Sequence, residues 1–365
     1  PQPFGPFACL LRNPCLKYSY QVSKIHICRL LLSQLFNLTE MDTDAGKGKG
    51  TSESKISLLS KLQNIPASFL KEITDNLSSD REIGDKGAFG TVYKGILEDG
   101  DVIAVKKLGE NCPVGQEKSF DNEVRNLMAV QHTNIVKLLG FCHETQKKVV
   151  EHNKKYIIVD VTETFLCYEY VPKGSLEKYL FESNKIDWDT RFKIIKGICQ
   201  GLHFLHKEMD RPVVHMDIRP DNIMLDDKMI PKISDFGLSR LMGQEQTRMN
   251  TQTVVGALGY MAPEYLYRGE ISTQSDIYSL GILIIQISTG EKIKPSVEDK
   301  CGTQFIDQVR KNWTDRQIAS MHAKLDAHRL KEIKKCIEIG LQCVDVDRKK
   351  RPPIEDIIAT LNGKC

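Results

Sequence analysis

The chain has 365 residues, of which 41% are hydrophobic and 27% are charged, a composition typical of a globular protein with one large or several smaller domains. Its 51 basic residues nearly balance its 48 acidic ones, so the net charge of +3 gives no electrostatic reason to expect a nucleic acid partner. The eleven cysteines are scattered singly, which argues against a paired Cys-x-x-Cys zinc site and is typical of reduced thiols.

The first 80 residues are predicted to lie outside the main domain. Residues 1–40 contain no acidic residue before Glu40, and we expect an unstructured or non-native upstream segment there. Residues 22–38 are the most apolar stretch, but Lys24 and Arg29 make it too polar to span a membrane, so no transmembrane segment is expected. Residues 41–80 read as a flexible linker followed by a helical lead-in that is broken at Pro66.

Residues 81–170 are predicted to form a small β-rich lobe. Two β-rich runs flank Asp99 and Gly100, which indicates a hairpin, because this dipeptide adopts positive φ at little cost. Apolar residues at helical spacing predict a helix over residues 116–131. The runs "YIIVDV" and "TFLCYEYV" are interpreted as two further strands.

Residues 171–361 are predicted to form a larger, mainly α-helical lobe. "DTRFKIIKGICQGLHFLHKE" has the pattern of a long amphipathic helix, with Asp189 as its expected N-cap. "DIYSLGILIIQISTG" is almost continuously apolar and predicts a buried central helix that ends at Gly290. The expected fold class is therefore α+β, with two lobes.

Two features of the small lobe suggest a nucleotide site. In "IGDKGAFGTVYKG", Gly84, Gly87 and Gly90 would let backbone amides approach phosphates, although a simple glycine-rich turn is the alternative. Lys106 lies in the apolar run "VIAVKK", where an ammonium group is costly unless it is paired. Glu123 on the following helix is the candidate partner; the alternative is an edge-strand lysine that reaches outward to solvent.

Three polar residues of the large lobe suggest metal and proton chemistry. Asp217 and Asn222 are five residues apart with Pro220 between them, and Asp235 follows in "KISDFGLSR". Oxygen ligands from Asn222 and Asp235 suit a Mg²⁺ ion that is shared with phosphates. Asp217 would then be free to orient an attacking hydroxyl and accept its proton.

These motifs resemble the eukaryotic protein kinase family. "AVKK", "NEV", "HMDIRPDNIML", "SDFG" and "YMAPE" occur in the family's order, and "HTNIVKLLGFC" and "LCYEYVPKGSLEKYL" are similar to plant receptor-like kinases, including cytoplasmic ones. The resemblance covers residues 81–361 and implies a bilobal kinase-like fold, with ATP and Mg²⁺ as cofactors and Ser/Thr hydroxyls of proteins as acceptors. It further implies a receptor or membrane-associated signalling complex as partner, and a cytoplasmic location or one at the plasma membrane through that partner.

The resemblance also implies roles for individual residues. Catalytic roles fall on Lys106, Glu123, Asp217 and Arg219, and Mg²⁺ ligation falls on Asn222 and Asp235. The residues implied to contact ATP lie on the glycine-rich loop, the next strands and the hinge: Gly84, Gly87, Phe89, Gly90, Val92, Ala104, Lys106, Glu169 and Val171. The supporting positions are the gatekeeper before the hinge, an ion pair of the large lobe and a brace of the catalytic loop: Tyr168, Glu264 with Arg351, and Asp276.

Four departures from the family pattern bear on activity. Alignment back from Gly90 either places Asp85 where the first glycine belongs or inserts one residue there. Met216 replaces the arginine before the catalytic Asp, Arg219 replaces a lysine, and Ala257 replaces a threonine. None removes a group that handles phosphate, metal or proton, so an active kinase is favoured. A nucleotide-binding pseudokinase that acts as a scaffold is the alternative, and an adaptor working through the first 80 residues is a third reading.

Two further stretches raise questions that the motifs leave open. The stretch 143–163 is longer than the usual link between these strands, and its lysines predict either a docking edge or a solvated extra hairpin. The loop 235–264 offers several candidate phosphorylation sites: Ser239, Thr247, Thr251 and Thr253.

Overall fold

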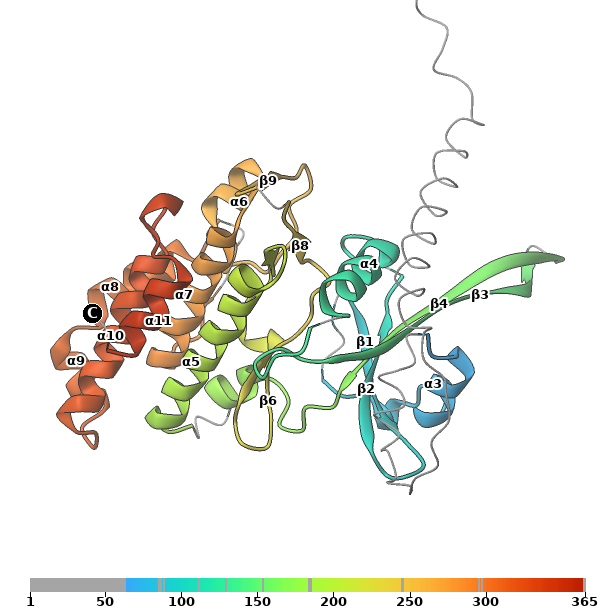
Figure 1. Cartoon of the computed structure of the whole chain (residues 1–365), viewed down its shortest axis with the longest axis horizontal. Helices are drawn as coiled ribbons and strands as arrows, with labels where there is room; N and C mark the ends of the chain where they lie inside the picture. The colour runs from blue at the N-terminus through green and yellow to red at the C-terminus, as the bar shows by residue number, and fades with distance from the viewer. Residues whose placement is uncertain are drawn as a thin grey trace, which may run out of the picture. The chain divides into compact units, whose positions relative to one another are not determined.

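The computed structural model describes residues 64–363, apart from 85–86, 88, 111, 129, 153, 183–185, 244–245, 295 and 297 (Figure 1). The predictions made for residues 1–40, for the linker 41–55, for the start of the helical lead-in and for Asp85 lie outside the described residues.

The small lobe is built on a four-stranded antiparallel sheet with the strand order β1-β2-β4-β3. The strands are β1 (Gly90–Ile96), β2 (Val102–Leu108), β3 (Leu138–His152) and β4 (Lys155–Glu169). The predicted hairpin between β1 and β2 is confirmed, and Gly100 has a φ of 89° in its turn. Helix α4 (Gln116–Leu127) packs against β3 and β4 (Figure 1).

Helix α3 (Ala67–Ile73) covers part of the sheet. It begins directly after Pro66, which occupies the N-cap position with a φ of −58° and an extended ψ of 138°. Leu70 and Ile73 are buried in one cluster with Ile103 and Phe165 of the sheet. Lys71 of this helix forms an ion pair with Glu163 of β4 at 2.7 Å, so the lead-in is attached to the sheet by apolar and ionic contacts. A short 3₁₀ turn, Ser79–Arg81, follows it.

The hairpin of β3 and β4 differs from the prediction. The two predicted strands "YIIVDV" and "TFLCYEYV" are a single strand, because Thr162 and Glu163 continue the pairing with β3 without interruption. Each strand has 15 residues, and the register runs from Leu138 opposite Tyr168 to His152 opposite Lys155. The half nearer the turn carries exposed side chains and projects from the lobe (Figure 1).

The large lobe is mainly helical, which confirms the predicted α+β class. Its α-helices are α5 (Trp188–His203), α6 (Pro263–Arg268), α7 (Thr273–Thr289), α8 (Thr303–Asn312), α9 (Asp315–Met321), α10 (Ala327–Cys343) and α11 (Ile354–Leu361). Its short strand pairs are β5 (Val213–Val214) with β8 (Arg240–Leu241), β6 (Ile223–Leu225) with β7 (Pro231–Ile233), and β9 (Met249–Asn250) with β10 (Glu270–Ile271). Single π or 3₁₀ turns lie at Lys178–Glu182, Phe204–Glu208, Pro220–Asn222 and Arg348–Lys350.

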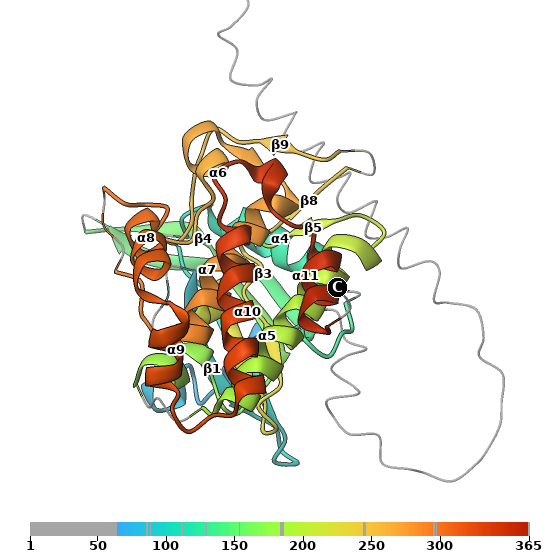
Figure 2. The same ribbon diagram turned by 90° about the vertical axis from the view of Figure 1, so that its left-hand side faces the viewer.

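Helix α7 is the central helix that the sequence predicts. Every residue from Ser275 to Thr289 is buried, and the helix ends at Gly290, which adopts a left-handed φ of 74°. It packs closely on α10 (Figure 2). A Cβ added at Gly281 would lie 2.6 Å from the Cβ of Cys343, so a larger residue there would force the two helices apart.

The expected N-cap of α5 was wrong by two residues. Asp187 caps the helix, and its Oδ1 accepts a hydrogen bond of 2.7 Å from the amide of Thr190. Asp189 lies inside the first turn and instead forms an exposed ion pair with Arg329 of α10 at 2.8 Å. Asp187 and Asp189 are equally good N-cap residues by sequence. The ion pair of Asp189 with Arg329, which the sequence does not reveal, distinguishes them.

One buried cluster extends from the small lobe into the large one. Leu127 of α4 and Leu166 of β4 belong to the same apolar core as Ile198 of α5 and Leu283 of α7. The structure therefore fixes the strands that carry the predicted site against the loops of the large lobe. No helix among the residues that the structure describes is long and apolar enough to cross a membrane.

Candidate active site

Lys106 of the small lobe contacts a carboxylate of each lobe. It lies on β2, its side chain is 8% exposed, and its Nζ is 2.7 Å from Oε1 of Glu123 and 2.8 Å from Oδ1 of Asp235. Burial alone would lower the pKa of Lys106, but the Asp235 and Glu123 carboxylates outweigh it and hold that pKa above its usual value. The lysine is therefore a fixed cation, paired inward rather than reaching outward to solvent.

Glu123 uses both of its carboxylate oxygens. Oε1 accepts from Lys106, and Oε2 accepts a hydrogen bond from the phenol of Tyr168, the last residue but one of β4. Burial raises the pKa of Glu123, and Lys106 opposes that rise. Burial and the neighbouring carboxylate raise the pKa of Tyr168 well above its ordinary value, so the phenol stays protonated and remains a donor.

Asp235 follows β7 and faces Lys106. Its φ of 64° lies in the left-handed region, which is uncommon for a residue other than glycine and is typical of functional loops. Burial acts to raise the pKa of Asp235, but the charge of Lys106 and the hydrogen bond from it keep that pKa below its ordinary value. The carboxylate is consequently ionised, as an oxygen ligand of a cation must be.

Asn222 and Asp217 are joined directly. The amide nitrogen Nδ2 of Asn222 donates to the backbone oxygen of Asp217 at 2.9 Å and to its Oδ2 at 2.8 Å. The backbone oxygen of Asn222 in turn accepts from the amide of Ser234 at 2.9 Å, which ties the Asp217 loop to the residue before Asp235. Because Nδ2 makes both bonds to Asp217, the amide oxygen Oδ1 is the group with which Asn222 can hold a cation.

Asp217 has a raised pKa. Burial is the main cause and brings the pKa to about 6, while the nearby Arg219 guanidinium acts to lower it. His215 lies against the same residue: its Nδ1 accepts from the amide of Asp217 at 3.2 Å, so its Nε2 carries the proton and donates to the oxygen of Ser234 at 3.1 Å. Burial lowers the pKa of His215, which agrees with a neutral ring in this tautomer.

Asp276, in the first turn of α7, holds the backbone of the catalytic loop. Its Oδ2 accepts from the amide of His215 at 2.7 Å, and its Oδ1 accepts from the amide of Met216 at 2.8 Å. The ring of His206 adds a third contact to Oδ2 at 2.8 Å. Met216 itself is buried and has a φ of 70°, so the carboxylate holds the loop in a backbone conformation that methionine rarely adopts.

The glycine-rich loop lies over Lys106. The Phe89 ring centroid is 5.6 Å from Nζ of Lys106, and a Cβ added at Gly237 would lie 3.1 Å from the same ring. Gly84 and Gly90 both have positive φ, and a Cβ at Gly90 would come within 2.0 Å of the backbone oxygen of Lys107. Glycine is thus required at position 90, where the loop joins β1.

The predicted ATP contacts on the strands and hinge line up across the sheet. Val92 is opposite Lys106 in the β1–β2 register, and Ala104 is opposite Tyr168 in the β2–β4 register. Glu169 accepts through Oε1 from the amide of Lys137 at 2.8 Å and from the Nζ of Lys232, a residue of the large lobe, at 3.0 Å. Its side chain is therefore engaged, and its backbone amide donates to the oxygen of Lys137 at 3.0 Å. Val171 is buried, and its backbone oxygen accepts from Gly174.

Arg219 lies at the edge of this group. Its guanidinium pairs with Asp221, two residues away, rather than with Asn222 or Asp235. The structure thus brings together five of the predicted site residues: Lys106, Glu123, Asp217, Asn222 and Asp235. Arg219 lies next to this group, and its ion pair is with Asp221. The pairing of Arg219 with Asp221 is explained by their proximity in the 3₁₀ turn that begins at Pro220.

Glu264 and Arg351 form the expected ion pair of the large lobe. Two parallel contacts of 2.7 Å join their oxygens and nitrogens, and both side chains are at most 1% exposed. Arg351 also donates to the backbone oxygens of Gln274 and Asp345 and lies over the Tyr278 ring. This bidentate geometry satisfies the buried guanidinium almost completely.

Sequence reasoning missed three contributors to this site. They are the His206 contact to Asp276, the bond from Tyr168 to Glu123, and the Lys232 contact to Glu169. Each joins residues at least 45 positions apart, and none lies in a short motif, so spacing alone could not find them.

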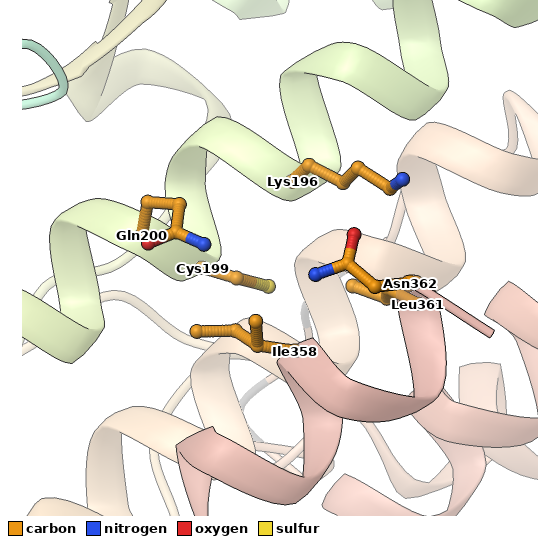
Figure 3. A pocket seen from close by; sticks show the side chains of 6 residues that line it. All are labelled: Lys196, Cys199, Gln200, Ile358, Leu361 and Asn362. Atoms are coloured by element: carbon orange, nitrogen blue, oxygen red, sulfur yellow. The ribbon is translucent and has the colours of Figure 1, made fainter. Parts of the chain in front are cut away.

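A small cavity also lies among the residues that the structure describes. No cluster of three or more His, Cys, Asp or Glu side chains suited to a metal is present among them. A cavity of about 40 Å³ lies between α5 and α11 and is lined by Lys196, Cys199, Gln200, Ile358, Leu361 and Asn362 (Figure 3). It has room for only a few waters and contains none of the site residues named above.

Residues 77–361 match the family described as "Protein kinase domain", and the chain belongs to this family. The predicted bilobal kinase fold and the resemblance to plant receptor-like kinases are thereby confirmed.

The chain is similar to several receptor-like kinases of Arabidopsis thaliana. It is 36% identical over 301 residues to cysteine-rich receptor-like protein kinase 25, covering 81% of this chain and 42% of that protein. It is 39% identical over 306 residues to a G-type lectin S-receptor-like serine/threonine-protein kinase, covering 82% and 34%. It is 39% identical over 292 residues to cysteine-rich receptor-like protein kinase 36, covering 79% and 41%. The chain therefore spans less than half the length of these relatives.

Proposed function

We propose that the chain is an ATP-dependent protein kinase that transfers the γ-phosphoryl group to Ser/Thr hydroxyls of proteins in plant receptor-like signalling. The observation that carries this proposal is Lys106, held at once by Glu123 at 2.7 Å and by Asp235 at 2.8 Å. A lysine fixed by an acid of the small lobe and next to an acid of the large lobe is the arrangement that phosphoryl transfer in this family requires. The names of the relatives support Ser/Thr specificity.

The nucleotide would bind between the glycine-rich loop and the hinge. We assign the α- and β-phosphates to Lys106 and to the backbone of Gly84, Gly87, Phe89 and Gly90. The three glycines, which have no Cβ, let backbone amides approach the phosphates. The adenine would contact Val92, Ala104 and the backbone of Glu169 and Val171. The engaged side chain of Glu169 supports a backbone role for this residue.

Asn222 and Asp235 fit a Mg²⁺ ion. They provide an amide oxygen and an ionised carboxylate, the hard donors that this cation prefers, and phosphate and water oxygens would complete its shell. When bound, Mg²⁺ supplies positive charge that neutralises the phosphate oxygens during transfer.

Asp217 is assigned as the base that orients the acceptor hydroxyl and takes its proton. A pKa of about 6 keeps most of the carboxylate ionised at neutral pH while making it a better base than an ordinary aspartate. Asn222 fixes Oδ2 and leaves Oδ1 for the hydroxyl. Arg219 and its partner Asp221 would lie beside the γ-phosphate, where the guanidinium adds positive charge.

The domain bounds, the cellular compartment and the partner form the last part of the proposal. We place the kinase domain at residues 81–361, with the lobes meeting near residue 170, and treat α3 as a lead-in that belongs structurally to the small lobe. Seven cysteines of the described part are unpaired and buried, which supports a reducing compartment. We therefore expect the kinase to act in the cytoplasm, with a receptor or membrane-associated complex as its partner.

The decisive experiment is radiolabelled autophosphorylation of the full chain with Mg-ATP, beside an Asp235→Asn variant. We expect label in the wild type and none in the variant, because the variant loses an ionised oxygen ligand. Binding of Mg-ATP by the wild type without any transfer, to itself or to a generic protein substrate, would overturn the proposal and favour a pseudokinase scaffold.

A further inference from the structure

The β3–β4 hairpin exposes apolar side chains on both of its faces. On one face Val149, Ile158 and Tyr156 are 66%, 69% and 77% exposed, and on the other Val150 and Ile157 are 38% and 42% exposed. Single exposed apolar residues are common, but these five lie in three consecutive cross-strand pairs of a projecting hairpin (Figure 1). A contiguous apolar patch of this kind marks an interaction surface.

Among the residues that the structure describes, no strand pairs with the outer edge of β3 along this patch. The sheet order places β3 at the edge, and the amide of Ile65 already donates to the outward-facing oxygen of Phe141 at 2.7 Å. The β3–β4 register is uninterrupted from Phe141 to His152, so every second residue after Phe141 also directs its backbone groups outward. Lys147, Val149 and Glu151 are three of these residues.

The side chains of these three residues form a pattern that complements itself. Lys147 precedes Val149 by two positions and Glu151 follows it by two, and strand alternation places all three on the face that carries Ile158 and Tyr156. If a second β3 strand lies antiparallel with Val149 opposite Val149, each Lys147 faces a Glu151. All the outward backbone groups then face each other as well.

We propose that the chain dimerises through this edge, with β3 pairing antiparallel to β3 of a second copy about a two-fold axis at Val149. The paired hairpins form one four-stranded ribbon. Its exposed face carries an apolar row in the order Ile158, Val149, Val149, Ile158, flanked on each side by a Lys147–Glu151 pair. One apolar pair, Val149 with Val149, and two opposite-charge pairs, Lys147 with Glu151, lie across the new strand boundary and stabilise the same register.

The charge of Lys148 also disfavours a neighbouring register. Lysines on an edge strand commonly block pairing, and a register centred on Lys148 would place two Lys148 side chains opposite each other. Centring on Val149 instead places Lys148 opposite Val150, with no repulsion. Lys148 therefore disfavours the register shifted by one residue and is compatible with the register centred on Val149.

Charge exchange in the full chain tests the register. Sedimentation equilibrium at low ionic strength should show a concentration-dependent dimer for the wild type. Lys147→Glu and Glu151→Lys each place like charges opposite each other twice, so each variant alone should weaken dimerisation about tenfold or more. An equimolar mixture of the two variants restores both ion pairs and should recover the dimer.

Lys148→Glu is the matched control, since it makes the same charge change at the neighbouring position, which faces no acid; its dimer constant should stay within about threefold of wild type. A monomeric wild type would overturn the proposal, as would a dimer that survives both single variants or a mixture that fails to recover. Binding of a monomeric wild type to anionic phospholipid vesicles, lost in Lys147→Glu, would assign the patch to a membrane surface instead.

Discussion

The phenol of Tyr168 donates a hydrogen bond to the same carboxylate, that of Glu123, that holds Lys106. One side chain at the end of β4 thus supports the acid on α4 and, through it, the lysine on β2. The position just before the hinge is connected to the phosphate-binding lysine by two successive contacts.

Tyr168→Phe should therefore lower kcat/KM by about three- to tenfold. The ring still fills its place in the core, but Glu123 loses a buried donor, a loss of roughly 1 kcal/mol in the positioning of Lys106. Steady-state kinetics with a protein substrate would measure this, with thermal unfolding as a check that the fold persists. Equal kcat/KM values for both proteins would show that the bond plays no part in holding Lys106.

Lys106→Met should preserve the fold and abolish most of the phosphoryl transfer. Methionine fills a similar volume, but the nucleotide phosphates lose their fixed cation, and the buried Glu123 would become protonated. A transfer assay at saturating Mg-ATP would measure the change. Transfer close to the wild-type rate would mean that the nucleotide phosphates bind elsewhere.

Asp217 should give the pH profile its acidic limb. A base acts when deprotonated, so with a pKa of about 6 its active fraction is high above pH 7 and falls about tenfold per unit below pH 6. Asp217→Asn should lower kcat by about 10²–10⁴ and abolish this limb, with little change in ATP affinity. Loss of ATP binding with unchanged turnover would contradict the assignment.

Activity should depend little on phosphorylation of the loop 235–264. Met216 offers neither charge nor donor to a phosphate, and Arg240 already donates to the backbone oxygens of Leu238 and Ser239. Changing Thr247, Thr251 and Thr253 together to Ala should leave most of the initial rate, as should phosphatase treatment of the wild type. A drop of more than about tenfold, equivalent to 1.4 kcal/mol of barrier, in both samples would reveal another receiving cation.

Ser239 should be removed from the candidate phosphorylation sites. Its side chain is fully buried, donates to the oxygen of Phe236 at 2.6 Å and accepts from Asn126 at 2.6 Å. The sequence could not distinguish this serine from the exposed Thr247, because the two partners of Ser239 come from the folded loop and from α4.

Arg351→Leu should destabilise the large lobe strongly. Removing the guanidinium leaves the buried Glu264 without its bidentate partner, and breaking a buried pair on one side costs about 3–5 kcal/mol. Urea unfolding followed by fluorescence would measure the loss. Arg351→Lys is the informative companion: it keeps the charge but not the fork, so a stability equal to wild type would show that geometry is unimportant there.

The sequence predicts the parts of the fold that local pattern determines. Helix α7 is recognisable because its continuous apolar run and terminal Gly290 are local features. The length of the β3–β4 hairpin cannot be recognised in this way, because the polar residues Thr162 and Glu163 look like a break between two strands. Only their pairing with β3 shows that the strand continues through them. The motif residues of the site are likewise local, whereas the contacts that position them, such as His206 on Asp276, exist only in three dimensions.

The hold of Asp276 on backbone amides has a consequence for how this site can change over time. The carboxylate accepts from backbone N–H groups, which every residue type except proline supplies, so neither contact uses the side chain at 216. A single codon change can therefore exchange arginine and methionine at position 216. Arginine can receive a phosphate group of the loop 235–264 and methionine cannot, while Asp217 keeps its position in either case. Control by loop phosphorylation can thus be lost or gained in one evolutionary step. The backbone amide of residue 216 determines the path of the loop, and its side chain determines the response to phosphate.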